Sequence, residues 1–230
     1  MRKLIHPLLL FLMKQQKKHE LHMLNSHPQI VGNAIYAVNH SCRYDVPYAA
    51  EAIGRRAYVL VGRQHLNIID RMAFFLNGVV YVDRKSRPDK VVAKNKMKEL
   101  VLRGKNLFMF PEGTWNLTPS TPMLPLYWGI IDIARETKRP IIPLILEYKK
   151  EACYIKWGEP FYVCETDTKQ KKIEQLSDEM ASLRWDIWEH FPRAARAEID
   201  DTEWEKEKQR RMAECPKADY EYEKSVILRR

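Results

Sequence analysis

The feature that most constrains this chain is an alternation of short apolar runs and helical patterns between residues 34 and 164. The apolar runs are continuous and rich in Val, Ile, Tyr and Phe, as expected of buried strands. They are Ala34–Asn39, Tyr58–Gly62, Val79–Val82, Leu107–Phe110, Ile141–Glu147 and Cys153–Lys156. Strands that alternate with helices favour an α/β domain with a mostly parallel central sheet flanked by helices.

Helical patterns fill the gaps between these strands. We expect helices at Val46–Arg55, Asn67–Leu76, Pro88–Arg103 and Leu126–Thr137. Asp45 is a suitable N-cap for the first helix. Pro88 suits the first turn of the third helix, and Gly104 suits its end.

The composition changes after Val163. Apolar residues then recur at intervals of three and four, which predicts one long amphipathic helix: Ile173, Leu176, Met180, Leu183, Ile187 and Phe191. We therefore divide the chain into an N-terminal segment (1–33), an α/β domain (34–164) and a C-terminal helical appendage (165–230).

The net charge of +9 lies in the main body of the chain. Residues 1–164 carry 25 Lys/Arg and 13 Asp/Glu, whereas residues 165–230 carry 14 and 17. Nine of the cations fall between Arg84 and Lys105. Such a run suits an anionic membrane, an acidic carrier protein or a CoA phosphate, and it is equally typical of a solvated helix face. No nucleic-acid-binding motif accompanies it, so we do not expect nucleic acid as a partner.

The N-terminus has an apolar stretch from Leu4 to Met13 that is flanked by Lys and Arg. It is shorter than the ~20 apolar residues of a transmembrane helix, and no small-residue cleavage site follows it. It suits a helix in a membrane interface or one packed on the body. The four cysteines have no C-x-x-C spacing and no clustering with His. We therefore expect no metal site, no transmembrane helix, and a cytoplasmic protein on the inner face of the membrane.

His40 and Asp45 are separated by four residues and follow the first predicted strand directly. Such a pair can abstract a proton, with His as the base and Asp orienting the ring and stabilising the imidazolium. The spacing alone also arises by chance in a chain this charged. Loops after strands hold functional groups in open α/β sheets.

Three further blocks follow strands along the chain: Gly78-Val79-Val80-Tyr81-Val82-Asp83-Arg84, Phe110-Pro111-Glu112-Gly113-Thr114 and Ile142-Pro143-Leu144. Together with Asn39-His40-x4-Asp45, these blocks resemble, in this order, the four motifs of the glycerolipid acyltransferases. That family includes the 1-acylglycerol-3-phosphate acyltransferases. The resemblance spans about Ala34 to Tyr162.

The resemblance implies an acyl-CoA or acyl-carrier-protein donor, a lysolipid hydroxyl acceptor at the membrane surface, and no cofactor. His40 would be the general base, with Asp45 orienting it. Arg84 would bind the acceptor phosphate, although a salt bridge to Asp83 is the simpler reading of that residue. Glu112, Gly113 and Thr114 would shape the acceptor site, with Glu112 accepting from a glycerol hydroxyl or holding Arg84.

Two departures from the family pattern concern the acceptor. Trp115 and Trp128 stand where the family often has a phosphate-binding Arg and Lys. The expected function is acyl transfer to 1-acylglycerol-3-phosphate, which gives phosphatidic acid. The alternatives are a non-phosphate lysolipid or amine acceptor, or a non-catalytic lipid-binding module. Cys42, beside His40, is an alternative nucleophile, and Pro143 is expected to end a strand ladder.

Overall fold

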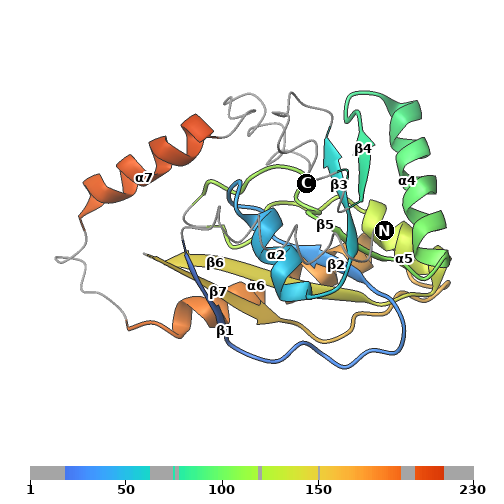
Figure 1. Cartoon of the computed structure of the whole chain (residues 1–230), viewed down its shortest axis with the longest axis horizontal. Helices are drawn as coiled ribbons and strands as arrows, with labels where there is room; N and C mark the ends of the chain where they lie inside the picture. Colours follow the sequence, from blue (N-terminus) through green and yellow to red (C-terminus); the bar gives the residue numbers. More distant parts are fainter. Residues whose placement is uncertain are drawn as a thin grey trace.

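A single seven-stranded sheet organises the described part of the chain (Figure 1). The computed structural model describes residues 19–62, 75, 78–118, 121–149, 151–192 and 200–214. The strand order is β1-β7-β6-β2-β5-β3-β4, and every neighbouring pair is parallel except β6 and β7. The strands are β1 (Glu20–Met23), β2 (Ile35–Val38), β3 (Ala57–Gly62), β4 (Val79–Val82), β5 (Asn106–Met109), β6 (Ile141–Lys149) and β7 (Ala152–Trp157).

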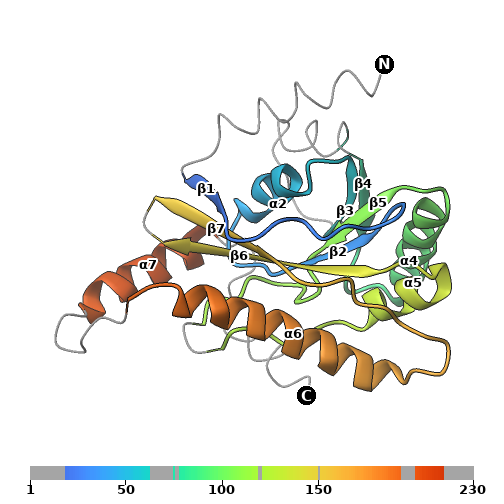
Figure 2. The same ribbon diagram turned by 90° about the horizontal axis from the view of Figure 1, so that it is seen from below.

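Helices cover both faces of this sheet, with α2 on one side and α6 on the other (Figure 2). Their bounds are α2 (Asp45–Ile53), α4 (Arg87–Leu102), α5 (Gly129–Thr137), α6 (Lys169–Glu189) and α7 (Asp201–Glu214). The mostly parallel sheet flanked by helices, with a helical C-terminal part, confirms the predicted fold class.

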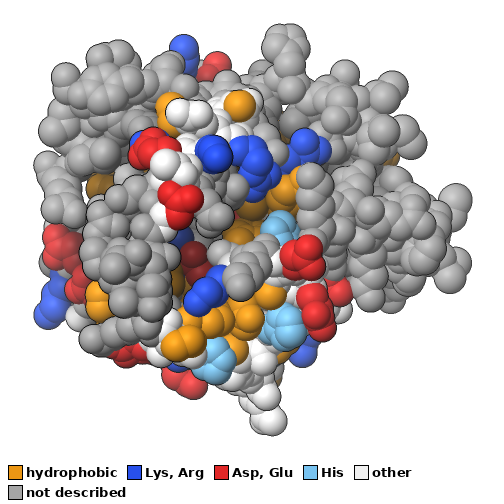
Figure 3. All heavy atoms as spheres, turned by 90° about the vertical axis from the view of Figure 1, so that its left-hand side faces the viewer, with side chains coloured by type: hydrophobic (Ala, Val, Ile, Leu, Met, Phe, Trp, Pro, Cys, Tyr) orange, Lys and Arg blue, Asp and Glu red, His pale blue; other side chains and the backbone are white. Residues whose placement is uncertain are grey.

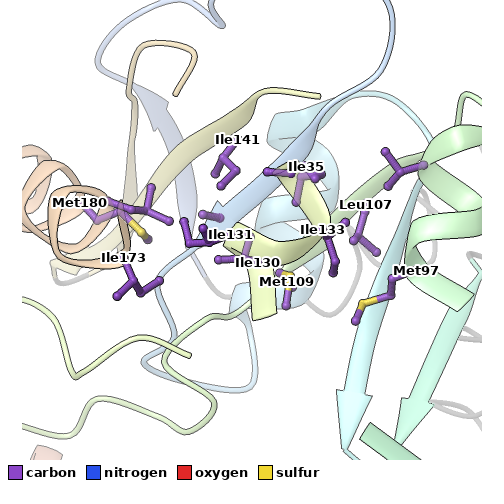
Figure 4. Close-up of a cluster of buried hydrophobic side chains, with 14 of the residues drawn as sticks. Ile35, Met97, Leu107, Met109, Ile130, Ile131, Ile133, Ile141, Ile173 and Met180 are labelled. Carbon is purple, nitrogen blue, oxygen red and sulfur yellow. The ribbon is translucent and has the colours of Figure 1, made fainter. Parts of the chain in front are cut away.

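Two buried clusters follow from the alternation of side chains along the strands. On β2, Ile35 points into the cluster formed with α4, α5 and α6, whereas Tyr36 points into the cluster under α2. The first cluster joins Met97 of α4, Ile130, Ile131 and Ile133 of α5, and Ile173 and Met180 of α6 (Figure 4). Because α6 contributes to this cluster, the C-terminal helix is part of the core beneath the sheet.

The structure extends the sequence expectations in two places. β1 was not predicted, because its residues Glu-Leu-His-Met show no strong pattern, and it is an edge strand paired only with β7. The division at residues 33 and 164 remains a prediction, although β1 and α6 bring residues from both sides of the α/β domain into the fold. The helix expected at Asn67–Leu76 lies outside the described residues except for Phe75, and residues 1–18 of the N-terminal segment also lie outside them.

One local detail corrects an interpretation. Asp45 is not an N-cap: Tyr44 occupies that position, and Asp45 lies in the first turn of α2. Pro143 lies within β6, which continues to Lys149, and it pairs with Ala37 of β2. The antiparallel ladder between β6 and β7 ends at Leu144, so Pro143 lies just outside the end of that ladder, as expected. Among the described helices, none combines the length and apolar character needed to cross a bilayer.

Candidate active site

The site lies where β2, β4 and β5 end. β5 lies between β2 and β3 in the sheet, and β4 lies beyond β3. The loops that follow these strands therefore meet at the carboxyl edge of a parallel sheet, where open α/β folds bind ligands. These loops carry the predicted residues His40, Arg84, Glu112, Gly113 and Thr114.

The loop that carries His40 is tied to the sheet by Asn39. The fully buried Asn39 amide donates to the Leu146 carbonyl at 2.9 Å and accepts from the Leu146 N–H at 2.7 Å. This two-point bond fixes the turn between β2 and α2 to the neighbouring strand β6. The next residue, His40, therefore starts from a defined backbone position.

His40 and Asp45 form a direct pair. His40 Nδ1 is 2.7 Å from Asp45 Oδ2, which fixes the Nδ1–H tautomer if the carboxylate is ionised. The same oxygen accepts the N–H groups of Ser41 and Cys42 at 2.6 and 2.9 Å, and the Tyr148 hydroxyl donates to Oδ1 at 2.7 Å. Asp45 is thus a buried carboxylate with a full set of donors.

These donors set the ionisation of Asp45. Its complete burial alone would raise the pKa, but hydrogen bonding and charge from His40, with the Cys42 N–H and the Tyr148 hydroxyl, hold the pKa of Asp45 below its usual value. Burial and the charge of Asp45 raise the pKa of Tyr148 well above its usual value. Asp45 is therefore ionised and Tyr148 is a neutral donor near neutral pH.

The His40 ring lies between two aromatic side chains. Phe110 stacks on it with ring centroids 4.1 Å apart, and Trp115 meets it edge-on at 5.8 Å. The side chain is 16% exposed. Nε2, the ring nitrogen opposite Asp45, has no hydrogen-bond partner in the described part of the chain.

The Glu112 carboxylate is hydrogen-bonded to the His40 backbone. It is fully buried, and it accepts the His40 N–H at 2.7 Å and the Leu124 N–H at 2.9 Å. Burial raises the pKa of Glu112 to about 7, although these two N–H groups and the charge of Arg184 lower it. Each of its oxygens accepts one N–H group, and among the described residues no ion pair joins Glu112 to Arg84.

Arg84 reaches across the end of β3. Its Nη1 donates to the carbonyl oxygen of Gly113, and its guanidinium lies over Gly62, where a Cβ would be 3.3 Å from Nε. No ion pair joins it to Asp83 among the described residues, so the salt-bridge reading is wrong. Arg84 is therefore placed beside the loop that carries Glu112.

Gly113 has a conformation that other residues rarely adopt. Its φ is +74°, and a Cβ would lie 2.3 Å from the ring of Tyr127. The expected close approach at this glycine is made by that aromatic ring. Thr114 is nearly buried next to it, at 8% exposed.

The two tryptophans that replace expected cations have different surroundings. Trp115 is buried against His40, whereas Trp128 is 58% exposed at the start of α5. Lys169 of α6 lies over the Trp128 ring at 5.0 Å and also pairs with Asp132 at 2.6 Å. Arg84, the residue predicted to bind the phosphate, reaches the loop after β5 through the Gly113 carbonyl.

Cys42 is not placed as a nucleophile. It is buried, and its Sγ lies 3.5 Å from Asp45 Oδ1. A thiol beside an ionised carboxylate is in a poor place to form a thiolate. The geometry therefore favours a packing role for Cys42.

Four of the nine cations in the basic run form ion pairs with carboxylates. Lys94 pairs with Asp132 at 3.0 Å and Lys98 with Glu136 at 2.5 Å, which joins α4 to α5. Lys96 and Arg103 both pair with Glu99. These pairs support the reading of the run as a helix face with structural ion pairs.

Two contributors to the site were not predicted, Tyr148 and Arg184. Both lie far from the motifs in sequence, and a single Tyr at a strand end or an Arg in an amphipathic helix carries no distinctive signal. The fold brings Tyr148 to Asp45, over 103 positions of sequence separation. Arg184 reaches the loop after β5 through Pro122.

The surface seen from the left-hand side of Figure 1 gathers hydrophobic and His side chains near its centre, with Lys and Arg beside them (Figure 3).

A hollow of about 510 Å³ is lined by residues 27–30 and 52–55, and none of the predicted site residues lines it. In the described ranges, no cluster of His, Cys, Asp and Glu has the arrangement of a metal site.

Comparison with known proteins agrees with this geometry. The model of the Acyltransferase family matches residues 16–147. The chain is 28% identical over 127 residues to the 1-acyl-sn-glycerol-3-phosphate acyltransferase of Saccharomyces cerevisiae, covering 54% of this chain and 42% of the relative. It is 26% identical over 145 residues to the human 1-acyl-sn-glycerol-3-phosphate acyltransferase alpha, covering 62% and 49%. The chain thus spans less than half of the length of these relatives.

A solved structure shares the fold. The crystal structure of the 1-acyl-sn-glycerophosphate (LPA) acyltransferase PlsC from Thermotoga maritima superposes with a TM-score of 0.63 at 17% identity, covering 85% of this chain and 83% of that one. The family match includes His40, Asp45, Arg84 and the Glu112-Gly113-Thr114 block. The chain belongs to the acyltransferase family.

Proposed function

We propose that this protein transfers an acyl group from an acyl thioester to the free hydroxyl of a lysolipid, with 1-acylglycerol-3-phosphate as the first candidate acceptor. The observation that carries the proposal is the His40–Asp45 pair at the carboxyl edge of the sheet. Nδ1 is held by the carboxylate at 2.7 Å, and Nε2 has no partner among the described residues. The names of the relatives agree with this acceptor.

Each step has a group to perform it. His40 Nε2 takes the hydroxyl proton as the acceptor oxygen attacks the thioester carbonyl, and Asp45 offsets the positive charge that develops on the ring. The new C–O bond forms, the C–S bond breaks, and the thiolate leaves with the proton returned by His40. A thiol with a pKa of ~8.5 is a good leaving group, so one base suffices and no acyl-enzyme is needed.

The acceptor phosphate is assigned to Arg84. A guanidinium can bind a phosphate with two parallel hydrogen bonds, and Arg84 already lies against the Gly113 carbonyl beside the Glu112 loop. Arg84→Ala should raise the KM for the lysophosphatidate by about tenfold or more while the KM for the donor changes little. Equal changes in both KM values would remove the phosphate assignment.

A different acceptor is the second candidate, because of the two tryptophans. Trp115 packs on His40 where a second cation was expected, which makes the surroundings of His40 more apolar. A lysolipid with an uncharged head or an amine would fit such surroundings. The proposed donor is acyl-CoA or acyl-carrier protein.

An acceptor screen tests the proposal directly. Purified protein is incubated with one labelled acyl-CoA and a panel that holds lysophosphatidate, other lysolipids and amines, and the products are identified by mass spectrometry. Labelled phosphatidic acid as the main product supports the first candidate. Another acylated lipid or amide supports the second, and no acylated product with either acyl-CoA or acyl-carrier protein contradicts acyl transfer.

We also propose a peripheral place on the inner membrane surface, cytoplasmic side, with residues 1–18 as the anchor. Removal of residues 2–18 should reduce flotation with anionic liposomes while circular dichroism of the remaining protein is preserved. Unchanged flotation would contradict the anchor. These residues lie outside the described part of the structure, so the proposal rests on their sequence alone.

A further inference from the structure

The C-terminal helix reaches the active-site loops through one side chain. Arg184 of α6 is 4% exposed, and its Nε donates to Glu147 Oε2 of β6 at 2.6 Å. Its Nη1 donates to the carbonyl oxygen of Pro122 at 2.8 Å. The ion pair needs only one edge of the guanidinium, so the second bond extends the contact to the segment 121–124.

That segment is bonded to the His40 backbone by two routes. In the first, the Leu124 N–H donates to Glu112, whose other oxygen accepts the His40 N–H at 2.7 Å. In the second, Asn116 donates its side-chain amide to the Thr121 carbonyl at 2.8 Å and its own N–H to the His40 carbonyl at 2.6 Å. Both the N–H and the carbonyl of His40 are therefore held by groups that depend on segment 121–124.

The charge of Arg184 also acts on Glu112, one of the residues that hold the His40 backbone. It lowers the pKa of Glu112, whereas Asp45 on α2 raises it. Glu112 is bonded to the backbone N–H of the titratable residue His40, Arg184 itself is paired with Glu147, and Arg84 is bonded to the Gly113 carbonyl next to Glu112 in sequence. An ionised Glu112 can accept from two N–H groups, but a protonated one offers a single strong acceptor oxygen, so the cation favours the form that holds both.

We propose that Arg184 is a positioning residue for the acyl transfer: by binding the Pro122 carbonyl and facing Glu112, it holds segment 121–124 and so fixes the His40 backbone. The inference rests on the proposed function, and it assigns the C-terminal helix a part in the site. His40 must stand within hydrogen-bond reach of the acceptor hydroxyl, and displacements of about 1 Å in such groups cost up to ~100-fold in rate.

The test compares Arg184→Met, Arg184→Lys and Lys156→Met. Arg184→Met keeps an unbranched apolar side chain but removes both hydrogen bonds and the charge. Arg184→Lys keeps the charge but lacks the planar guanidinium, which bonds to Glu147 and Pro122 at the same time. Lys156→Met is the matched control, because it breaks another α6-to-sheet ion pair, with Asp186 at 2.7 Å, that does not touch segment 121–124. The first measurement is a pH titration of the His40 backbone amide by NMR, which needs no acyl transfer.

In the wild type, this amide should follow the ionisation of Glu112 with a midpoint near 7. In Arg184→Met the midpoint should move to higher pH, in Arg184→Lys it should stay near the wild-type value, and in Lys156→Met it should be unchanged. The second measurement is kcat at saturating substrates. It should fall about tenfold or more in Arg184→Met and severalfold in Arg184→Lys, with no change in Lys156→Met.

If Arg184→Met does not fold, the lysine variant decides the question through its kcat and the chemical shift of the His40 amide. The inference is overturned if neither Arg184 variant changes the chemical shift of the His40 amide. It is also overturned if Lys156→Met changes this chemical shift and kcat as much as the Arg184 variants do. Absence of acyl transfer by the wild type would refute the proposed function instead, and the amide titration would still decide the link from Arg184 to His40.

Discussion

The buried carboxyl of Glu112 predicts an unusual pH dependence of stability. Its pKa rises from 4.5 to about 7 in the folded protein, a difference of about 2.5 units. Each unit corresponds to about 1.36 kcal/mol, so this group accounts for roughly 3 kcal/mol of the free energy of unfolding. Because Glu112 is fully buried, solvent screening does not reduce this figure.

The sign follows from proton binding. Between pH 4.5 and about 7, the folded Glu112 keeps its proton while the unfolded one has lost it, so the unfolded state binds fewer protons. The free energy of unfolding contributed by Glu112 therefore falls as the pH rises through this window. Asp45 acts in the opposite sense, since its lowered pKa gives stability that is lost only as the pH falls through that low folded value.

The perturbation is Glu112→Gln, which keeps the size of the side chain and removes the titration. The free energy of unfolding of the variant, relative to wild type, should increase by about 3 kcal/mol between pH 4.5 and 7.5. Urea unfolding followed by circular dichroism at several pH values measures this, with the exposed Glu159→Gln as the control that should keep the wild-type slope. If the free energy of unfolding changes with pH in the same way in wild type and Glu112→Gln, the conclusion that the buried Glu112 keeps its proton in this pH range is refuted.

Three further substitutions test single contacts. Tyr148→Phe removes the hydroxyl that donates to Asp45 at 2.7 Å, and it should lower the free energy of unfolding by about 1.5–3 kcal/mol and reduce kcat; unchanged urea midpoints would contradict the contact. Gly113→Ala places a Cβ 2.3 Å from the Tyr127 ring at a φ of +74°, and it should cost about 1–3 kcal/mol or more, partly restored by Tyr127→Ala in a double-mutant cycle. Ser86→Ala removes the cap that accepts from the Asp89 N–H at 3.2 Å, and thermal unfolding should report a loss of about 1 kcal/mol.

The sheet was predictable because buried parallel strands have a strong local signature. The apolar runs at 35–38 and 141–147 need no partner to be read as strands, since both faces of each are largely covered. The run at 79–82 is rich in Val and Tyr, which identifies it as a strand although Tyr81 is exposed. β1 escaped prediction because it is a short edge strand whose pairing with β7 depends on residues 132 positions away. Asp45 was misread as the N-cap of α2; it lies in the first turn of that helix, and one of its donors, Tyr148, is brought to it from β6 only by the tertiary fold.

The contact between His40 and Asp45 was predictable because both residues belong to one local motif and are close together in sequence. The groups that hold the pair were not predictable in this way. Glu112 was identified as a site residue, but its two N–H partners come from separate loops that meet only in the fold. Arg184 sits in a helix whose pattern predicts burial of its apolar face, and nothing in that pattern shows that a cation from this helix reaches the Pro122 carbonyl.

The central claim is that His40 is the general base of acyl transfer. Thiol release from acyl-CoA, measured with a thiol reagent in the presence of the acceptor found by the screen, tests it in wild type, His40→Ala and Cys42→Ala. The loss in His40→Ala should be about 100-fold or more, Cys42→Ala should keep activity, and no burst of thiol should precede addition of the acceptor. Equal release by wild type and His40→Ala would contradict the account.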